Sequence, residues 1–205
     1  MIHQEGLDLI KEFEGLHRVG RDGLVHVYPD AGYGWKWATQ GYGSTTNEDT
    51  GQRLRRGDPP IDRATAERWL AEGIQKRYEP AVRALIKVPL SEISISAMVS
   101  FAYNVGVGGF KKSTVLKRIN RGDFHGVPEA LTWWNKSNGR VFRGLTRRRV
   151  AEGALFMKGL SEAPSVTPPP PTKKNEYDKT RPGKNVGYTG LWGRLFRAFI
   201  SYIGR

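Results

Sequence analysis

Two carboxylates near the N-terminus have the residue type and the placement that glycoside hydrolysis requires. Glu14 stands at the end of a predicted helix, and Asp30 follows a predicted strand in Tyr28-Pro29-Asp30. The reaction needs one carboxylic acid that protonates the leaving oxygen and one carboxylate that acts on the anomeric carbon directly or through water. A helix packed on a small sheet forms a cleft across which two such groups can face each other. The chain has 20 acidic residues and most carboxylates are solvated, so this pair by itself is weak evidence.

The elements that carry these two residues follow from the hydrophobic pattern. Residues 2–14 are predicted to be helical because Leu7, Ile10 and Phe13 recur every three residues. Between residues 16 and 57 glycine is frequent, and short alternating segments are typical of strands joined by turns. A hairpin turn is expected at Gly20-Arg21-Asp22-Gly23. This part of the chain therefore predicts a small, irregular sheet.

Helical patterns dominate the chain after Pro59-Pro60. A helix that begins at Asp62 or at Thr65 is expected to run to about Leu85. Further helices are expected at 91–105, near 114–120, at 127–136 and at about 143–158. The first of these is strongly apolar and is expected at the centre of a bundle. The predicted fold class is α+β, with a small irregular β-sheet lobe and a larger helical lobe within residues 1–160.

The last quarter of the chain has a different composition. Residues 161–189 are typical of a Pro-rich, basic linker, and residues 190–205 of a cationic amphipathic helix. One face of that helix would carry Leu191, Trp192, Leu195, Phe196, Phe199, Ile200 and Ile203. Such a helix is too short to span a bilayer but suits its interface, so we expect contact with anionic membrane or lipopolysaccharide. Docking on the rest of the chain, or an oligomer contact, is the alternative.

Charge and cysteine content narrow the partners and cofactors. The net charge of +13 and the pI of about 10.1 favour a polyanionic partner, and the chain has no recognisable motif for reading nucleic acid. The absence of cysteine excludes disulfides and thiolate metal sites, and four histidines without a tight pair predict no metal. The N-terminus lacks the basic-then-apolar layout of a secretory signal, which predicts synthesis in the cytoplasm.

Ordered motifs along residues 3–158 give the chain a specific resemblance. The first are Phe13-Glu14-Gly15, Tyr28-Pro29-Asp30 and Thr39-Gln40-Gly41-Tyr42-Gly43-Ser44-Thr45. The later ones are Val88-Pro89-Leu90, Ala97-Met98-Val99-Ser100-Phe101-Ala102-Tyr103-Asn104-Val105-Gly106, Ser113-Thr114-Val115-Leu116, Asn120-Arg121-Gly122-Asp123, Trp134-Asn135 and Gly144-Leu145-Thr146-Arg147-Arg148-Arg149-Val150-Ala151-Glu152. In this order they resemble the phage lysozyme family, glycoside hydrolase family 24, which implies a lysozyme-like fold.

The resemblance implies a reaction and roles for three residues. Glu14 would be the general acid, Asp30 would orient and activate a water, and Thr39 would help to hold that water. The reaction would invert the anomeric configuration. The substrate would be the β-1,4 bond between N-acetylmuramic acid and N-acetylglucosamine in peptidoglycan, and no cofactor would be needed.

The candidate substrate-binding residues are Tyr42, Asn104 and Arg148. Asn104 suits a sugar on the cleft floor and equally suits a buried backbone group. The resemblance supports an arginine near Glu14 without deciding among the consecutive residues Arg147, Arg148 and Arg149.

The chain departs from the family pattern at two places. Glu14 and Asp30 are sixteen residues apart, several more than is usual, which fits an enlarged first hairpin. Asp22 lies nearer the usual spacing and is the rival second carboxylate, but Arg21 and Gly23 beside it are typical of a turn. Gln40 stands where the family prefers isoleucine, and we expect it to affect packing more than chemistry.

These observations predict a phage endolysin that lyses the host cell. It would be a monomer, present in the host cytoplasm before lysis and acting on the cell wall in the periplasm. The alternatives are a lytic transglycosylase, which needs a catalytic glutamate without the aspartate and threonine, and a non-catalytic protein that binds peptidoglycan or membrane.

Overall fold

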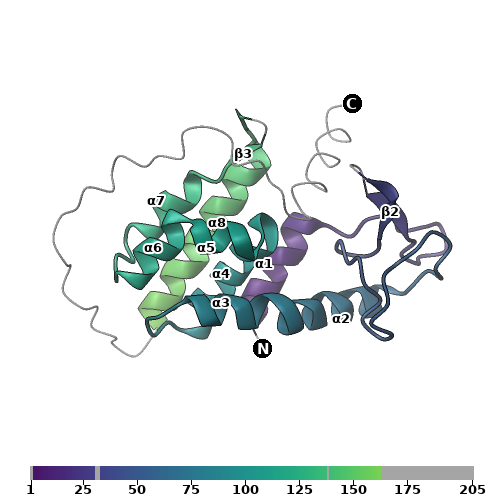
Figure 1. Cartoon of the computed structure of the whole chain (residues 1–205), viewed down its shortest axis with the longest axis horizontal. Coiled ribbons are helices and arrows are strands. Elements are labelled where there is room, and N and C mark those ends of the chain that lie inside the picture. Colours follow the sequence, from purple (N-terminus) through teal and green to yellow (C-terminus); the bar gives the residue numbers. More distant parts are fainter. Residues whose placement is uncertain (1, 31–32, 138, 163–205) are drawn as a thin grey trace.

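The chain folds into two lobes of unequal size. The computed structural model describes residues 2–30, 33–137 and 139–162. Figure 1 shows the helices gathered on one side, strand β2 with its loops on the other, and helix α2 reaching from the helices toward the strands. The predicted α+β class, with a small sheet and a larger helical lobe, is therefore confirmed.

The first helix, α1 (Gln4–Glu14), packs on the helical lobe through an apolar face that includes the fully buried Ile10. It agrees with the predicted helix except that it begins at residue 4. Gly6 lies against Ser96 so closely that a Cβ at this position would collide with the Cβ of Ser96. The glycine that weakened the helical pattern is therefore what lets α1 approach α4.

The small sheet lies in the segment where alternating residues predicted strands. Strands β1 (Tyr28–Asp30) and β2 (Gly34–Thr39) are antiparallel, with Tyr28 opposite Thr39 and an irregularity between Pro29 and Asp30. The predicted turn is confirmed, since the Gly23 N–H donates to the Gly20 carbonyl at 3.1 Å. Residues 24–27 form only isolated bridges, so the regular pairing begins later than the alternation suggests.

Gln40 has the packing role expected of it. The residue is fully buried, and its amide nitrogen donates to the carbonyls of Val25 at 2.8 Å and Pro59 at 3.1 Å. It therefore joins the end of β2 to two separate loops.

One continuous helical segment links the two lobes. It begins with α2 (Arg63–Gly73), where the Asp62 side chain accepts a hydrogen bond from the Thr65 N–H at 2.7 Å. It continues through a π-helical turn, η1 (Ile74–Tyr78), into α3 (Glu79–Leu85). The predicted cap at Asp62 and end at Leu85 are confirmed.

The apolar helix α4 (Glu92–Val105), capped by Ser91, forms the centre of the helical lobe as predicted. Every residue from Ile93 to Val105 is buried, and α1, α3, α5 and α8 pack around it. Helix α8 (Arg143–Glu162) makes the largest contact with α4, and it extends four residues past the predicted end.

Short elements complete the helical lobe and correct part of the sequence prediction. They are α5 (Val107–Lys112), α6 (Thr114–Asn120), α7 (Val127–Thr132), β3 (Lys136–Ser137) and β4 (Arg140–Val141). Helix α5 was not predicted. The helix predicted for 127–136 ends at Thr132, because the chain then enters the β3–β4 hairpin, which turns at Gly139 with a φ of 78°.

The described residues include no helix that combines the length and the apolar character needed to cross a membrane. The predicted linker and the predicted amphipathic helix at 190–205 lie outside the described residues.

Candidate active site

Glu14 places a nearly buried carboxylate at the C-terminal end of α1. The helix ends there because Gly15 adopts a φ of 70° while its N–H bonds the Lys11 carbonyl. The Glu14 side chain is 12% exposed, and its Oε1 accepts a hydrogen bond from Nη1 of Arg148 at 2.7 Å. Burial raises the pKa of the Glu14 carboxyl, and the positive charge of Arg148 offsets only part of that rise. Such a carboxyl keeps its proton to higher pH, as a general acid must.

The structure distinguishes the three consecutive arginines of α8. Arg147 is 76% exposed and lies 3.8 Å from Glu12, whereas the Arg148 side chain is 4% exposed and contacts Glu14. Arg149 is fully buried and donates to Oδ1 of Asn104 at 3.0 Å. Arg148 is therefore the arginine beside Glu14. Its guanidinium is directed at a buried carboxylate, which suits holding Glu14 more than holding a sugar.

A further buried carboxylate, that of Glu152, lies behind these arginines and was not predicted from the sequence. Oε1 of Glu152 accepts hydrogen bonds from Arg148 Nε at 3.1 Å, Arg149 Nη2 at 3.0 Å and Ser100 Oγ at 2.9 Å. The signal available in the sequence was the four-residue spacing from Arg148 to Glu152 on one predicted helix, since that spacing places both side chains on the same helical face.

The strands supply the other predicted catalytic residues. Asp30 is 4% exposed, and its Oδ1 accepts a hydrogen bond from the Tyr33 N–H at 2.9 Å. Thr39 is fully buried, and its hydroxyl donates to the Trp37 carbonyl at 3.2 Å. Burial raises the pKa of Tyr28, which lies opposite Thr39, and the charges of Glu14 and Asp30 raise it further. Both charges therefore act on the Tyr28 phenol, so the end of α1 and strand β1 face the same region.

Asp22, the rival second carboxylate, lies in a different environment. Its side chain is 45% exposed, and it accepts hydrogen bonds from the Leu24 N–H at 3.0 Å and from His26 Nε2 at 2.9 Å. The Leu24 N–H holds the pKa of Asp22 below its usual value, and His26 adds to this. These contacts are those of a residue that caps a surface turn, so the arrangement favours Asp30.

The histidines of this region have structural partners. Nε2 of His17 lies 2.8 Å from the Glu14 carbonyl oxygen, and the His17 ring packs edge-on against Tyr28 with centroids 5.8 Å apart. Within the part of the chain that the structure describes, no group of three or more His, Asp or Glu residues is placed to hold a metal ion.

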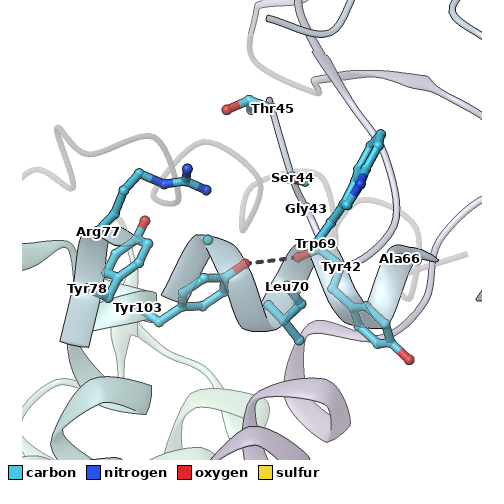
Figure 2. Close-up of a pocket in the computed structure, with 11 residues that line it drawn as sticks. Tyr42, Gly43, Ser44, Thr45, Ala66, Trp69, Leu70, Arg77, Tyr78 and Tyr103 are labelled. Atoms are coloured by element: carbon cyan, nitrogen blue, oxygen red, sulfur yellow. Dashed lines mark hydrogen bonds between the residues drawn. The ribbon is translucent and has the colours of Figure 1, made fainter. Parts of the chain in front are cut away.

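A pocket lies where the strand lobe, α2, η1 and α4 meet. Its lining comprises Tyr42, Gly43, Ser44, Thr45, Ala66, Trp69, Leu70, Gly73, Arg77, Tyr78 and Tyr103. Figure 2 shows the Tyr103 hydroxyl bonded to the Tyr42 carbonyl while the Tyr42 phenol points away from Tyr103, and the bond measures 3.2 Å. That phenol lies 3.5 Å from Glu67. Tyr42 therefore lines the pocket through its backbone. Tyr103 links the pocket to Glu14, since burial and the charge of Glu14 both raise the pKa of Tyr103.

Asn104 has a contact that neither sequence alternative foresaw. It is 8% exposed, and its Oδ1 accepts from the buried Arg149. The amide therefore satisfies a guanidinium, where the sequence suggested a sugar or a backbone group.

Comparison with known proteins finds one family. The profile described as phage lysozyme matches residues 11–152. The endolysin of Bacillus phage B103 is 35% identical over 186 residues, which is 90% of this chain and 65% of that protein. The endolysin of Acyrthosiphon pisum secondary endosymbiont phage 1 is 36% identical over 159 residues, which is 76% of this chain and 97% of that protein.

The chain is also similar to solved structures of phage endolysins and lysozymes. The endolysin from Escherichia coli O157:H7 phage FAHEc1 matches with a TM-score of 0.64 and 32% identity, covering 80% of this chain and 97% of that one. A mutant of P22 lysozyme matches with a TM-score of 0.63 and 27% identity, covering 77% and 98%. The chain spans 65% of the B103 endolysin and 55% of the endolysin of Bacillus phage PZA, less than two thirds of either.

Proposed function

The chain belongs to the phage lysozyme family, and we propose on that premise that it is an endolysin. It hydrolyses the β-1,4 bond between N-acetylmuramic acid and N-acetylglucosamine in peptidoglycan. The observation that carries this proposal is the buried Glu14, whose pKa burial raises and which Arg148 holds. It is supported by Asp30, a second buried carboxylate, whose charge, like that of Glu14, acts on Tyr28. Peptidoglycan also fits the net charge of +13, because the bacterial envelope is rich in anionic polymers.

The environments of the two carboxylates support different roles. Glu14 gives its proton to the leaving oxygen, as its raised pKa allows. Asp30 takes the proton of a water that attacks the anomeric carbon from the opposite side, and Thr39 helps to hold that water. The carbon is inverted in this reaction, so the α-anomer is the first product, which NMR of a fresh digest detects.

The glycan is proposed to run past the carboxylates toward the pocket lined by residues 42–45. We propose that backbone groups beside Tyr42 contact the sugar there. We assign Arg148 to the positioning of Glu14, and Asn104 to the support of Arg149, on the contacts described above.

The test is the release of reducing ends from purified Gram-negative sacculi. We expect Glu14→Gln and Asp30→Asn each to lower the rate by about 10²-fold or more, the size typical of lost acid–base catalysis. Asp22→Asn is the matched control, because it makes the same change on the exposed turn, and it should retain activity. Full activity of Glu14→Gln would overturn the mechanism. Loss in Asp22→Asn with activity in Asp30→Asn would exchange the two aspartates. Anhydro ends in place of reducing ends would indicate a transglycosylase.

We also propose that residues 1–160 form the catalytic domain, with the linker at 161–189 and the amphipathic segment at 190–205 directing the enzyme to anionic membrane or lipopolysaccharide. The support is the sequence pattern of residues 190–205, which carry three arginines and no acidic residue. The protein is proposed to stay in the host cytoplasm as a monomer until lysis and then to act in the periplasm.

Deleting residues 164–205 tests the membrane role. Activity on purified sacculi should be kept while lysis of intact Gram-negative cells falls. An equal effect on both substrates contradicts the role, and size-exclusion chromatography with light scattering checks the monomer.

A further inference from the structure

The buried charges behind Glu14 form a chain of shared contacts. Arg148 uses all three guanidinium nitrogens: Nη1 bonds Glu14 at 2.7 Å, Nε bonds Glu152 at 3.1 Å, and Nη2 bonds the Ser100 carbonyl at 3.2 Å. Because the guanidinium is planar, these contacts fix the direction in which Nη1 meets Glu14.

Glu152 is the carboxylate that both buried arginines share. Besides accepting from Arg148 and Arg149, its Oε2 lies 2.9 Å from Nε of Arg149, and its side chain is 0% exposed. When Glu14 is protonated, Glu152 leaves the group of Glu14, Arg148, Arg149 and Glu152 with one net positive charge. Without Glu152 there would be two positive charges beside a carboxyl that must hold a proton.

We propose that Glu152 is a positioning residue for the reaction: it aims Arg148 at Glu14 and balances the two arginines, so that Glu14 can work as an acid. This inference rests on the proposed function. It accounts for a glutamate that is fully buried between two arginines, and it explains how a directly bonded arginine can hold Glu14 without forcing it to remain ionised.

The expected effect follows from the charge that Glu152→Gln removes. Two carboxylates that share a guanidinium lie roughly 7 Å apart, and a unit charge at that distance in an effective dielectric of about 20 moves a titration by roughly one to two pH units. The direction is downward, because loss of a negative neighbour favours the ionised form of Glu14. The other titratable and charged groups facing Glu14, which stay unchanged, are His17, Tyr28, Tyr103, Arg148 and Arg149.

The experiment measures the titration of the Glu14 carboxyl carbon by NMR in the full-length protein, with the signal assigned by its absence in Glu14→Gln. In parallel, kcat/KM on solubilised peptidoglycan is followed against pH. We expect Glu152→Gln to move the Glu14 titration and the alkaline limb of kcat/KM downward together by about one pH unit or more. Activity would fall about tenfold at neutral pH and be retained on the acid side. Glu162→Gln, the same change at an exposed position of α8, should move neither.

If Glu152→Gln does not fold, a second pair of variants tests the same effect. Arg149→Met with Glu152→Gln removes both partners of a buried ion pair, which proteins tolerate better than the loss of one. Glu14 should titrate lower in this double variant than in Arg149→Met alone. An unchanged Glu14 titration in a folded Glu152→Gln, or equal titrations in the second comparison, would overturn the inference. The NMR readout does not depend on activity, so failure of the proposed function would show separately, as wild-type protein that releases no reducing ends.

Discussion

Replacing Arg148 by methionine keeps an unbranched apolar stem and removes the guanidinium, with its charge, from three buried partners. Glu14 loses its 2.7 Å hydrogen bond, Glu152 loses one of three donors, and the Ser100 carbonyl loses the guanidinium. The side chain is 4% exposed, so water cannot simply take its place. The variant therefore leaves buried negative charge without a partner, which destabilises a protein more than removing both members of the pair does.

The size of the effect follows from that burial. Removing one partner of a buried ion pair costs about 3–5 kcal/mol, a large part of a typical stability of about 5–15 kcal/mol. With a urea m-value of about 2 kcal/mol/M, the unfolding midpoint should fall by about 2 M. The penalty should also depend on pH. Without Arg148 the pKa of Glu14 rises further, and a carboxyl with a raised folded-state pKa loses stability as pH rises. The deficit should therefore be smaller at pH 4 than at pH 7.

The assay is urea unfolding followed by circular dichroism at both pH values. Arg147→Met is the matched control, since the neighbouring side chain is 76% exposed, and it should change stability by no more than about 0.5 kcal/mol. If Arg148→Met unfolded at the same urea concentration as Arg147→Met, the buried network would contribute nothing to stability, and the reasoning built on it would be refuted.

Three further predictions concern stability. Gly6→Ala should cost about 1–3 kcal/mol by thermal melting, because the new methyl group collides with Ser96, whereas Gly144→Ala, with open space around its Cβ, should be close to neutral. Ser113→Ala should cost about 1 kcal/mol in urea unfolding, because the buried hydroxyl caps α6 by accepting the Leu116 N–H at 3.1 Å; an unchanged midpoint would contradict the cap. Glu14→Gln should be more stable than wild type at pH 7 and lose that advantage at pH 4. Burial raises the pKa of Glu14, so keeping this carboxyl ionised at pH 7 costs folding free energy. If Glu14→Gln were less stable than wild type at pH 7, the ion pair with Arg148 would outweigh the cost of burial.

Local patterns were sufficient to predict most of the elements. The three-residue recurrence that includes Ile10 predicted α1, and capping by Asp62 marked where α2 begins. The apolar run that starts at residue 91 predicted α4. These signals act over a few residues, so the sequence carries them directly. The hairpin of β3 and β4 was missed because strands of two residues give no period to detect.

The residues that we propose as catalytic were also suggested by the chain, since Glu14, Asp30 and Thr39 stand in ordered motifs. The sequence did not show which of the candidate side chains are buried. Whether Asp22 or Asp30 is buried depends on how an enlarged hairpin folds back, and the structure leaves Asp22 on the exposed turn.

Most of the helices, the approximate limits of the sheet and the acidic residue that ends α1 could be predicted from the sequence alone. Only the tertiary structure decided which arginine meets Glu14, because Arg147, Arg148 and Arg149 differ only in the direction each takes from one helix. It also decided that Glu152 stands behind that arginine. Burial and charge pairing between α1, α4 and α8 arise from contacts between residues more than forty positions apart in the sequence, which no local pattern records.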